Sequence, residues 1–280
     1  MTQKPIEHVF HYDGLDIAAQ EWGDPNGTPV LALHGWLDNC GSFAPLGVLL
    51  NKVRLIALDA PGHGLSSHRS ADGTYNIWQD VAVIYAVAEQ LGWSKFSLLG
   101  HSRGAMVCTL AAGTFPDRIT HLALLDTFVP LVIESQEQPE QLARSILDRR
   151  KRHGRTARVY PSIEALLATR LGGVTPLSKL SAPYIVARGM EAVERGYRWR
   201  SDEKLKIASE IKLTSESVKS FVKRITCPIL LLLSDIERIN RCYGMEAFAN
   251  DISVREIKGG HHFHMEEQVV DTARELDHFL

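Results

Sequence analysis

A serine flanked by glycines stands at residues 100–104, where the sequence reads Gly-His-Ser-Arg-Gly. This G-x-S-x-G pattern follows an apolar run at 96–99 that is typical of a buried strand, and it precedes a helix-like stretch at 105–113. At such a junction the serine is strained and its hydroxyl is exposed, while side chains on the glycines would collide with the neighbouring strand and helix. We therefore predict that Ser102 is a nucleophile. The alternative is a Gly-Ser turn without function.

A nucleophilic serine that attacks a carbonyl group needs hydrogen-bond donors for the oxyanion that forms. The amide of Arg103, at the positive N-terminal end of the predicted helix, is one candidate. The backbone amide of Trp36 is the other, because His-Gly-Trp at 34–36 follows an upstream predicted strand, where this arrangement supplies its second donor. In the alternative interpretation, residues 34–36 form a tight turn with Trp36 in the core.

A serine hydroxyl is a poor nucleophile at neutral pH and needs an adjacent base. The run Gly-Gly-His-His-Phe-His at 259–264 follows the last predicted strand. Its two glycines allow a sharp turn that places His261 over the strand ends, so we predict His261 as the general base, with His262 as the alternative. His264 is expected to pack or hydrogen-bond locally. We expect no metal, because adjacent histidines do not share one face and no nearby cysteine or carboxylate completes a site.

Short apolar runs alternate with helical patterns, which is typical of a mostly parallel α/β sheet flanked by helices. The alternation stops between residues 128 and 223, where the chain is charged, helix-like and punctuated by proline and glycine. We interpret 128–223 as a mainly helical cap inserted before the last two strands, and 1–127 with 224–280 as the core. Strands are predicted at 9–12, 17–22, 30–33, 53–58, 96–99, 122–125, 229–233 and 254–257, with a hairpin turn at Asp13-Gly14, and helices at 77–91, 105–113 and 266–280.

The composition is that of an ordinary globular chain: 280 residues, 45% hydrophobic and 23% charged. The net charge of −2 gives no reason to expect a nucleic acid or an anionic membrane as a partner. The four cysteines form no CxxC pair and are expected to be reduced. Because there is no apolar signal segment near Met1 and no apolar run of ~20 residues, we expect a cytoplasmic protein. The oligomeric state stays open.

Several motifs together resemble those of a known family. They are His-Gly-Trp-Leu-Asp-Asn at 34–39, Gly-His-Gly-Leu-Ser-Ser at 62–67, Gly-His-Ser at 100–102, Leu-Leu-Asp-Thr at 124–127 and His-x-x-His-Met at 261–265. The chain resembles the α/β-hydrolase superfamily and, within it, the serine hydrolase-like family. The resemblance covers most of the chain and is diffuse in the insertion. It implies an α/β-hydrolase fold and hydrolysis of an ester, thioester or amide.

The resemblance leaves the third catalytic residue open. In most relatives an acid follows the strand before the last one, where this chain reads Leu-Ser-Asp-Ile-Glu at 233–237. Glu237 aligns best with that acid, and Asp235 is a further candidate. The serine hydrolase-like relatives lack a clear acid there but keep an aspartate at the position of Asp126. Either strand end can serve if the carboxylate reaches and orients His261. We favour Asp126, then Glu237, then Asp235; the alternative for Asp126 is a turn carboxylate.

The side chain of Arg103 needs an explanation of its own, because apolar or aromatic residues are common at that position. In one interpretation its guanidinium pairs with a protein carboxylate and is structural. In the other it binds an acidic group of the substrate, which makes Arg103 a candidate substrate-binding residue. Asp59, His63 and His101 are expected to be structural. Residues 144–158 are basic with apolar positions, and we favour a solvated amphipathic helix over a recognition face.

The leading functional interpretation is acyl hydrolysis of a small or medium carboxylic ester, a small-molecule substrate, without a cofactor. One alternative is other chemistry on the same residues, such as C–C bond hydrolysis or perhydrolysis. Another is a non-enzymatic ligand-binding scaffold that keeps the fold for recognition. The presence of both Ser102 and His261 argues against the scaffold, because a pure receptor has no physical need for the pair.

Overall fold

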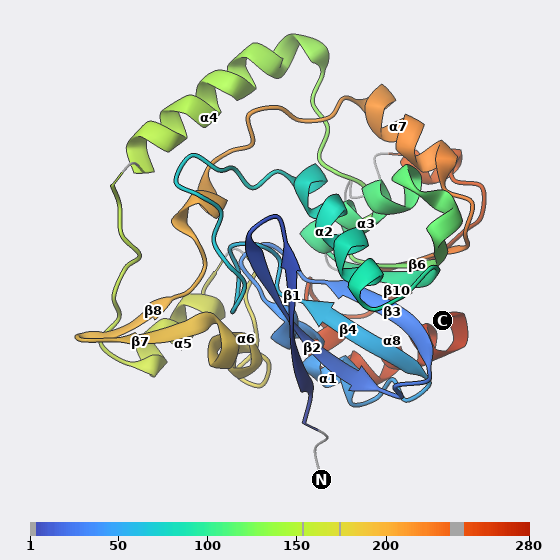
Figure 1. Cartoon of the computed structure of the whole chain (residues 1–280), viewed down its shortest axis with the longest axis horizontal. Coiled ribbons are helices and arrows are strands. Elements are labelled where there is room, and N and C mark those ends of the chain that lie inside the picture. Colours follow the sequence, from blue (N-terminus) through green and yellow to red (C-terminus); the bar gives the residue numbers. More distant parts are fainter. Residues whose placement is uncertain (1–3, 153, 174, 236–243) are drawn as a thin grey trace.

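The computed structural model describes residues 4–152, 154–173, 175–235 and 244–280, and its centre is an eight-stranded sheet (Figure 1). The strand order is β1-β2-β4-β3-β5-β6-β9-β10; β2 pairs antiparallel with β1 and β4, and the other pairs are parallel. The strands are β1 Ile6–Tyr12, β2 Leu15–Gly23, β3 Thr28–Leu33, β4 Val53–Leu58, β5 Phe96–His101, β6 Ile119–Leu125, β9 Ile229–Ser234 and β10 Ile252–Ile257. The predicted α/β-hydrolase architecture is confirmed.

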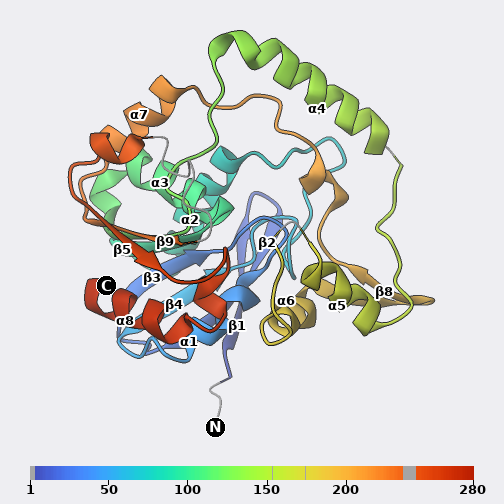
Figure 2. The same cartoon turned by 180° about the vertical axis from the view of Figure 1, so that it is seen from behind.

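Helices cover both faces of the sheet (Figures 1 and 2). Alternating strand residues point to opposite faces, so that Leu31 and Leu33 of β3 join one core cluster while Val30 and Ala32 join the other. The first cluster is closed by α2 (Ile77–Gln90), α3 (Arg103–Thr114) and α7 (Ser215–Arg224); the second is closed by α1 (Ala44–Gly47) and α8 (Val269–Phe279). Parallel strands buried on both faces explain the continuous apolar runs in the sequence.

The local predictions hold where local chemistry decides the structure. Asp13 and Gly14 both have positive φ, 49° and 77°, as the predicted two-residue hairpin turn requires. Helix α2 begins at Ile77 as predicted, and the side chain of Gln79 caps its N-terminus by accepting the backbone amide of Asn76 at 2.9 Å. Short 3₁₀ helices lie at Cys40–Phe43, Pro116–Arg118, Ser135–Glu137, Glu203–Lys206, Met245–Phe248 and Phe263–Met265.

The insertion after β6 differs in two respects from the mainly helical segment expected at 128–223. It contains α4 (Gln138–Arg152), α5 (Ile163–Leu171) and α6 (Ala182–Gly189), but also a hairpin of β7 (Met190–Val193) and β8 (Gly196–Trp199). Its last helix, α7, packs against α3 and places Val218 and Val222 in the core cluster. Residues 215–223 of the expected cap therefore form a helix that packs against the central sheet's core cluster.

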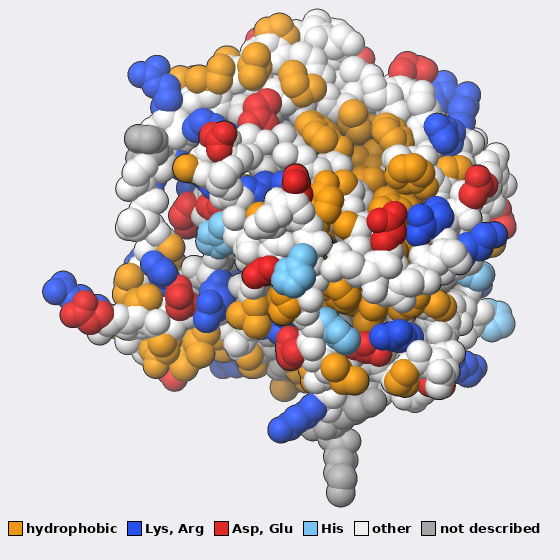
Figure 3. Space-filling view, in the orientation of Figure 1, with side chains coloured by type: hydrophobic (Ala, Val, Ile, Leu, Met, Phe, Trp, Pro, Cys, Tyr) orange, Lys and Arg blue, Asp and Glu red, His pale blue; other side chains and the backbone are white. Residues whose placement is uncertain are grey.

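Helix α4 lies along the rim of the molecule and turns its polar side inward. Gln141 and Ser145 are buried, whereas Leu142, Ile146 and Leu147 are 40%, 52% and 52% exposed. Figure 3 shows hydrophobic side chains along this upper edge, with basic side chains beyond one end. The expected amphipathic helix is present, but its apolar side faces solvent.

The cysteines agree with the expectation of reduced thiols where the structure describes them. Cys40, Cys108 and Cys227 are buried and unpaired, and Cys242 lies outside the described residues. Among the helices that the structure describes, none has the length and hydrophobicity needed to cross a membrane.

Several histidines are buried beneath the carboxyl ends of the strands. His101 and His264 have no exposed surface, and their ring centroids are 4.2 Å apart. Burial lowers the pKa of His63, His101 and His264 well below the ordinary value for histidine, so all three are neutral at physiological pH. Both ring nitrogens of His264 lack a hydrogen-bond partner in the described part of the chain.

Neutral buried histidines make the folded state sensitive to acid. In the unfolded chain they take up protons below about pH 6.5, whereas the folded chain does not, so stability falls as pH falls from that value. Each such histidine adds up to about 1.4 kcal/mol per pH unit to the slope. We predict that His264→Leu reduces the pH dependence of the free energy of unfolding, measured in urea between about pH 7 and pH 5, by about one histidine's share. The exposed His278 of α8 provides the control, because His278→Leu should leave the slope unchanged; equal slopes for parent and His264→Leu would contradict the account.

Candidate active site

Ser102 occupies the turn between β5 and α3 in a strained backbone conformation. Its φ of 52° and ψ of −115° lie in a region that residues with side chains rarely adopt. The flanking glycines permit the turn: a Cβ on Gly100 would lie 2.5 Å from the Cα of Ala105, and one on Gly104 would lie 2.0 Å from the carbonyl oxygen of Leu33. The collisions expected from the sequence are therefore present, with the helix at Gly100 and with β3 at Gly104.

Three predicted residues lie together at the carboxyl edge of the sheet. The Oγ of Ser102 is 2.9 Å from Nε2 of His261, and Nδ1 of His261 is 2.6 Å from Oδ2 of Asp126. Asp126 is fully buried, and the His261 side chain is 13% exposed. This is the geometry in which a carboxylate orients an imidazole whose other nitrogen can take a proton from a serine hydroxyl. Of the two nearby histidines, the structure places His261 and not His262 against Ser102.

Asp126 follows β6 and is fixed by the neighbouring strand β9. Its φ is 61°, and its amide donates to the carbonyl oxygen of Leu232 at 2.7 Å. Its Oδ1 accepts hydrogen bonds from the amide and the hydroxyl of Ser234, at 2.9 and 2.8 Å. Because Ser234 engages Oδ1, Oδ2 faces the imidazole. Sequence reasoning missed Ser234, whose only signal was its position at the end of a strand beside the candidate acids.

The loop that carries His261 is held from two sides. Gly259 has a φ of 113°, and its amide donates to Oδ1 of Asp235 at 2.8 Å. The ring of His101 donates from Nε2 to the carbonyl oxygen of His261 at 2.8 Å. Asp235, our third candidate for the acid, therefore supports the loop through Gly259. Glu237, the second candidate, lies outside the described residues.

The loop after β3 contains Trp36, whose backbone amide is the second candidate donor to the oxyanion. Leu37 has a φ of 60°, and its amide donates to Nε2 of His63 at 3.3 Å. His34 accepts the amide of Ala60 at 3.0 Å through Nε2. The side chain of Trp36 is 48% exposed and not in the core, and its Nε1 donates to the carbonyl oxygen of Leu205 at 2.9 Å.

Arg103 contributes to the site through its backbone and to the fold through its side chain. It is the first residue of α3, so its amide has no acceptor within the helix and is available to a ligand. Its Nη2 donates to Oδ2 of Asp80 in α2 at 2.7 Å, and that carboxylate is 2% exposed. The substrate-binding role considered for the Arg103 side chain is therefore corrected: a buried carboxylate of the protein already holds the guanidinium.

Asp38 is the centre of a buried polar cluster beside the site. Its Oδ2 is 3.2 Å from Nε2 of His262 and 3.9 Å from Nδ1 of His101, and its Oδ1 accepts from Arg170 of α5. Burial alone would raise the pKa of Asp38, but the facing His262 and Arg170 lower it below its ordinary range.

We expected no carboxylate near the histidine run, but this cluster contains one. Asp38, distant in sequence, places a carboxylate beside His101 and His262, and their ligand atoms lie within 4.8 Å of one another. Such a spacing could accommodate a metal ion, but Arg170 and His262 already pair with the carboxylate. The chemistry of the serine site does not require one.

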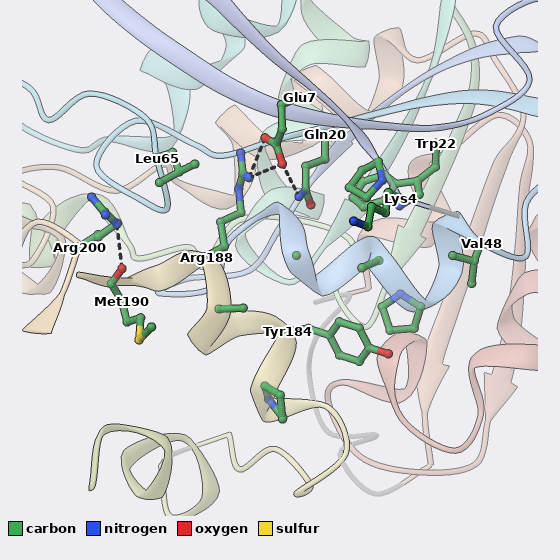
Figure 4. Close-up of a pocket in the computed structure, with 16 residues that line it drawn as sticks. Lys4, Glu7, Gln20, Trp22, Val48, Leu65, Tyr184, Arg188, Met190 and Arg200 are labelled. Atoms are coloured by element: carbon green, nitrogen blue, oxygen red, sulfur yellow. Dashed lines mark hydrogen bonds and ion pairs between the residues drawn. The ribbon is translucent and has the colours of Figure 1, made fainter. Parts of the chain in front are cut away.

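One cavity adjoins His261, a second adjoins Trp36, and a third lies away from the candidate site. One of about 380 Å³ is lined by His261 with Leu177 and Leu180, and one of about 300 Å³ is lined by Trp36 with Tyr160 and Trp199. A further cavity of about 560 Å³ lies between the N-terminal hairpin and α6 (Figure 4). There Arg188 binds Glu7 and also Asp59, whose carboxylate accepts the amides of Cys40 and Leu65, so that Asp59 is structural as expected.

Comparison with known proteins agrees with the fold. Residues 28–268 match the family model described as alpha/beta hydrolase fold. A serine hydrolase-like protein of Danio rerio is 31% identical over 265 residues, covering 89% of this chain and 81% of the relative, and one of Homo sapiens is 45% identical over 127 residues, covering 45% and 62%. The crystal structure of a hypothetical protein from Pseudomonas aeruginosa PAO1 matches with a TM-score of 0.90 and 35% identity, covering 98% of this chain and 97% of that one. The chain therefore belongs to the serine hydrolase-like family of α/β hydrolases.

Proposed function

We propose that this protein hydrolyses a small or medium carboxylic ester, or a related thioester or amide, through an acyl-enzyme formed on Ser102. The observation that carries the proposal is the continuous hydrogen-bonded series from Ser102 through His261 to the buried Asp126. It lies at the turn that presents the serine with its strained backbone. Neither a binding scaffold nor a turn without function has a physical need for this alignment.

In the first half of the reaction, the Oγ of Ser102 attacks the carbonyl carbon while Nε2 of His261 takes the hydroxyl proton. The negative charge that develops on the carbonyl oxygen is stabilised by the backbone amides of Arg103 and Trp36. The bond to the leaving group then breaks as His261 returns the proton to it, which leaves the acyl group on Ser102. Asp126 stabilises the imidazolium and keeps Nδ1 protonated throughout.

The second half of the reaction repeats these steps with water. His261 removes a proton from a water molecule whose oxygen attacks the acyl carbon, and the same two amides receive the oxyanion. Collapse of this intermediate breaks the bond to Ser102, whose Oγ regains the proton from His261. The products are a carboxylic acid and the free enzyme, and no cofactor enters the balance.

The cavities beside the site support a substrate of limited size. Their volumes of about 380 and 300 Å³ lie at the lower end of the range for pockets that bind small molecules. The insertion provides walls of both, through Leu177 and Leu180 on one side and Tyr160 and Trp199 on the other. Apolar and aromatic side chains line part of both cavities, beside charged residues such as Arg170 and Glu266, and they support esters of short to medium acyl or alcohol chains.

The nucleophile is tested by Ser102→Ala in a series of p-nitrophenyl esters of increasing acyl length. The variant removes one hydroxyl at an unchanged turn, so its circular dichroism and melting temperature should match those of the parent. The parent should turn over the short and medium esters, and the variant should lose several orders of magnitude in kcat, as much as ~10⁶ in a comparable triad. A variant within tenfold of the parent would refute the mechanism.

The acid is tested by comparing Asp126→Asn with Asp235→Asn. Asp126→Asn keeps an acceptor for Ser234 but misdirects the imidazole, so kcat should fall by about 10³–10⁴. Asp235→Asn keeps the oxygen that accepts the Gly259 amide, and kcat should stay within about threefold of the parent.

Glu237→Gln completes this comparison, because Glu237 was the second candidate from the sequence. If the large loss occurs in Glu237→Gln or Asp235→Asn while Asp126→Asn remains active, the assignment of Asp126 is wrong.

A further inference from the structure

Helix α4 exposes an apolar face that has no partner within the described chain. Leu142, Ile146 and Leu147 are 40%, 52% and 52% exposed, and Ala143 between them is exposed as well. At 3.6 residues per turn these positions share one side of the helix. Figure 3 shows the resulting row of hydrophobic side chains along the outer edge of the molecule. Single exposed apolar residues are common, but a helical face of four requires an explanation.

The opposite face of α4 is fixed to the protein by polar contacts. Gln138 and Gln141 donate through Nε2 to the carbonyl oxygens of Lys212 and Ser209, at 2.7 and 2.5 Å. Near the other end, Nη1 of Arg152 donates to Glu203 at 3.3 Å. These bonds determine the rotation of the helix about its axis. The apolar residues therefore cannot turn inward without breaking them, and the outward orientation is built into the structure.

Charge is divided between the two ends of the helix. Glu140 lies in the first turn, and Glu134 and Glu137 belong to the short 3₁₀ turn that precedes the helix, whereas the last turn contains the four basic residues 149–152. Glu140 and Arg150 are both exposed, and within the described chain neither forms an ion pair. A helix with Glu140 in its first turn, exposed apolar residues around an exposed Arg144 in its middle and a basic last turn is complementary to a second copy of itself in antiparallel orientation.

We propose that α4 is the dimer interface of this protein, packing against α4 of a second copy about a two-fold axis near residue 145. In that register Ala143 faces Leu147 of the other copy, and Glu140 faces Arg150. Each contact is made twice, as two-fold symmetry requires, so the small alanine accommodates the leucine at both sites.

An anionic lipid surface explains the face less well. Basic residues beside an apolar helical face favour such a surface, but Glu140 stands in the first turn of the same helix, and Glu134 and Glu137 lie in the short turn before it. These glutamates would be repelled by the lipid headgroups, whereas a second copy places Arg150 opposite Glu140. Because the contact is essentially one helix face, it belongs among the smaller protein interfaces, with a dissociation constant on the order of 10 µM.

Sedimentation velocity on the full chain over about 1–200 µM tests the interface. The parent should pass from monomer to dimer across this range. Glu140→Arg places two cations opposite each other at both ends of the interface, and Arg150→Glu does the same with two anions. Each variant should weaken association at least about tenfold. An equimolar mixture of the two should associate again, because every cation of one variant then faces an anion of the other.

A second pair of variants tests the apolar middle. Ile146→Asp should keep the chain monomeric, whereas Val270→Asp, at a 55% exposed position on α8, should dimerise like the parent. Melting temperatures confirm that each variant is folded.

The proposal is overturned by a parent that stays monomeric throughout, by a dimer that survives Glu140→Arg and Arg150→Glu, or by a mixture of these variants that does not associate. Binding of the monomer to phosphatidylglycerol vesicles that depends on Ile146 would assign the face to lipid instead.

Discussion

The charge of Asp38, buried within the oxyanion loop, is the constraint on which the arrangement of the site depends. A buried carboxylate must be paired, and removing one partner of such a pair typically costs about 3–5 kcal/mol. Its partners are His262, next to the candidate base, and Arg170 of the insertion, while the ring of His101, next to the candidate nucleophile, lies 3.9 Å away. Asp38 itself stands two residues after Trp36. One buried charge thus connects the base loop, the oxyanion loop and the insertion, and it lies beside the nucleophile turn.

The parallel sheet brings these loops to one edge, and the strained backbone is concentrated there. Among the described residues, positive φ in residues other than glycine occurs at Asp13 in the hairpin and at Leu37, Ser102 and Asp126. The last three present the oxyanion loop, the nucleophile and the acid. Such conformations cost of order 1–3 kcal/mol each and persist only where the surroundings determine them. The double hydrogen bond from Ser234 to Asp126 and the contact of α3 with β3 supply that support.

The sequence could predict those features that depend on residues close together in the chain, and not those that depend on residues far apart. The nucleophile turn, the hairpin at Asp13 and the start of α2 depend on neighbouring residues, so local sequence patterns predict them. The choice of Asp126 over Asp235, the role of Ser234 and the pairing of Arg103 with Asp80 depend on contacts between distant segments, which no local pattern encodes. The rotation of α4 depends on distant contacts as well, because backbone carbonyls of residues 209 and 212 determine it.

The central claim is that the alignment of Ser102 with His261 makes this one serine reactive. The most direct measurement is intact-mass and peptide mass spectrometry after brief treatment with a fluorophosphonate, which reacts covalently with activated serines. The expected result is a single adduct on the peptide that contains Ser102. In the His261→Ala variant, which still contains Ser102, this adduct should be lost. An adduct on another serine, no adduct on the folded parent, or undiminished labelling without His261 would contradict it.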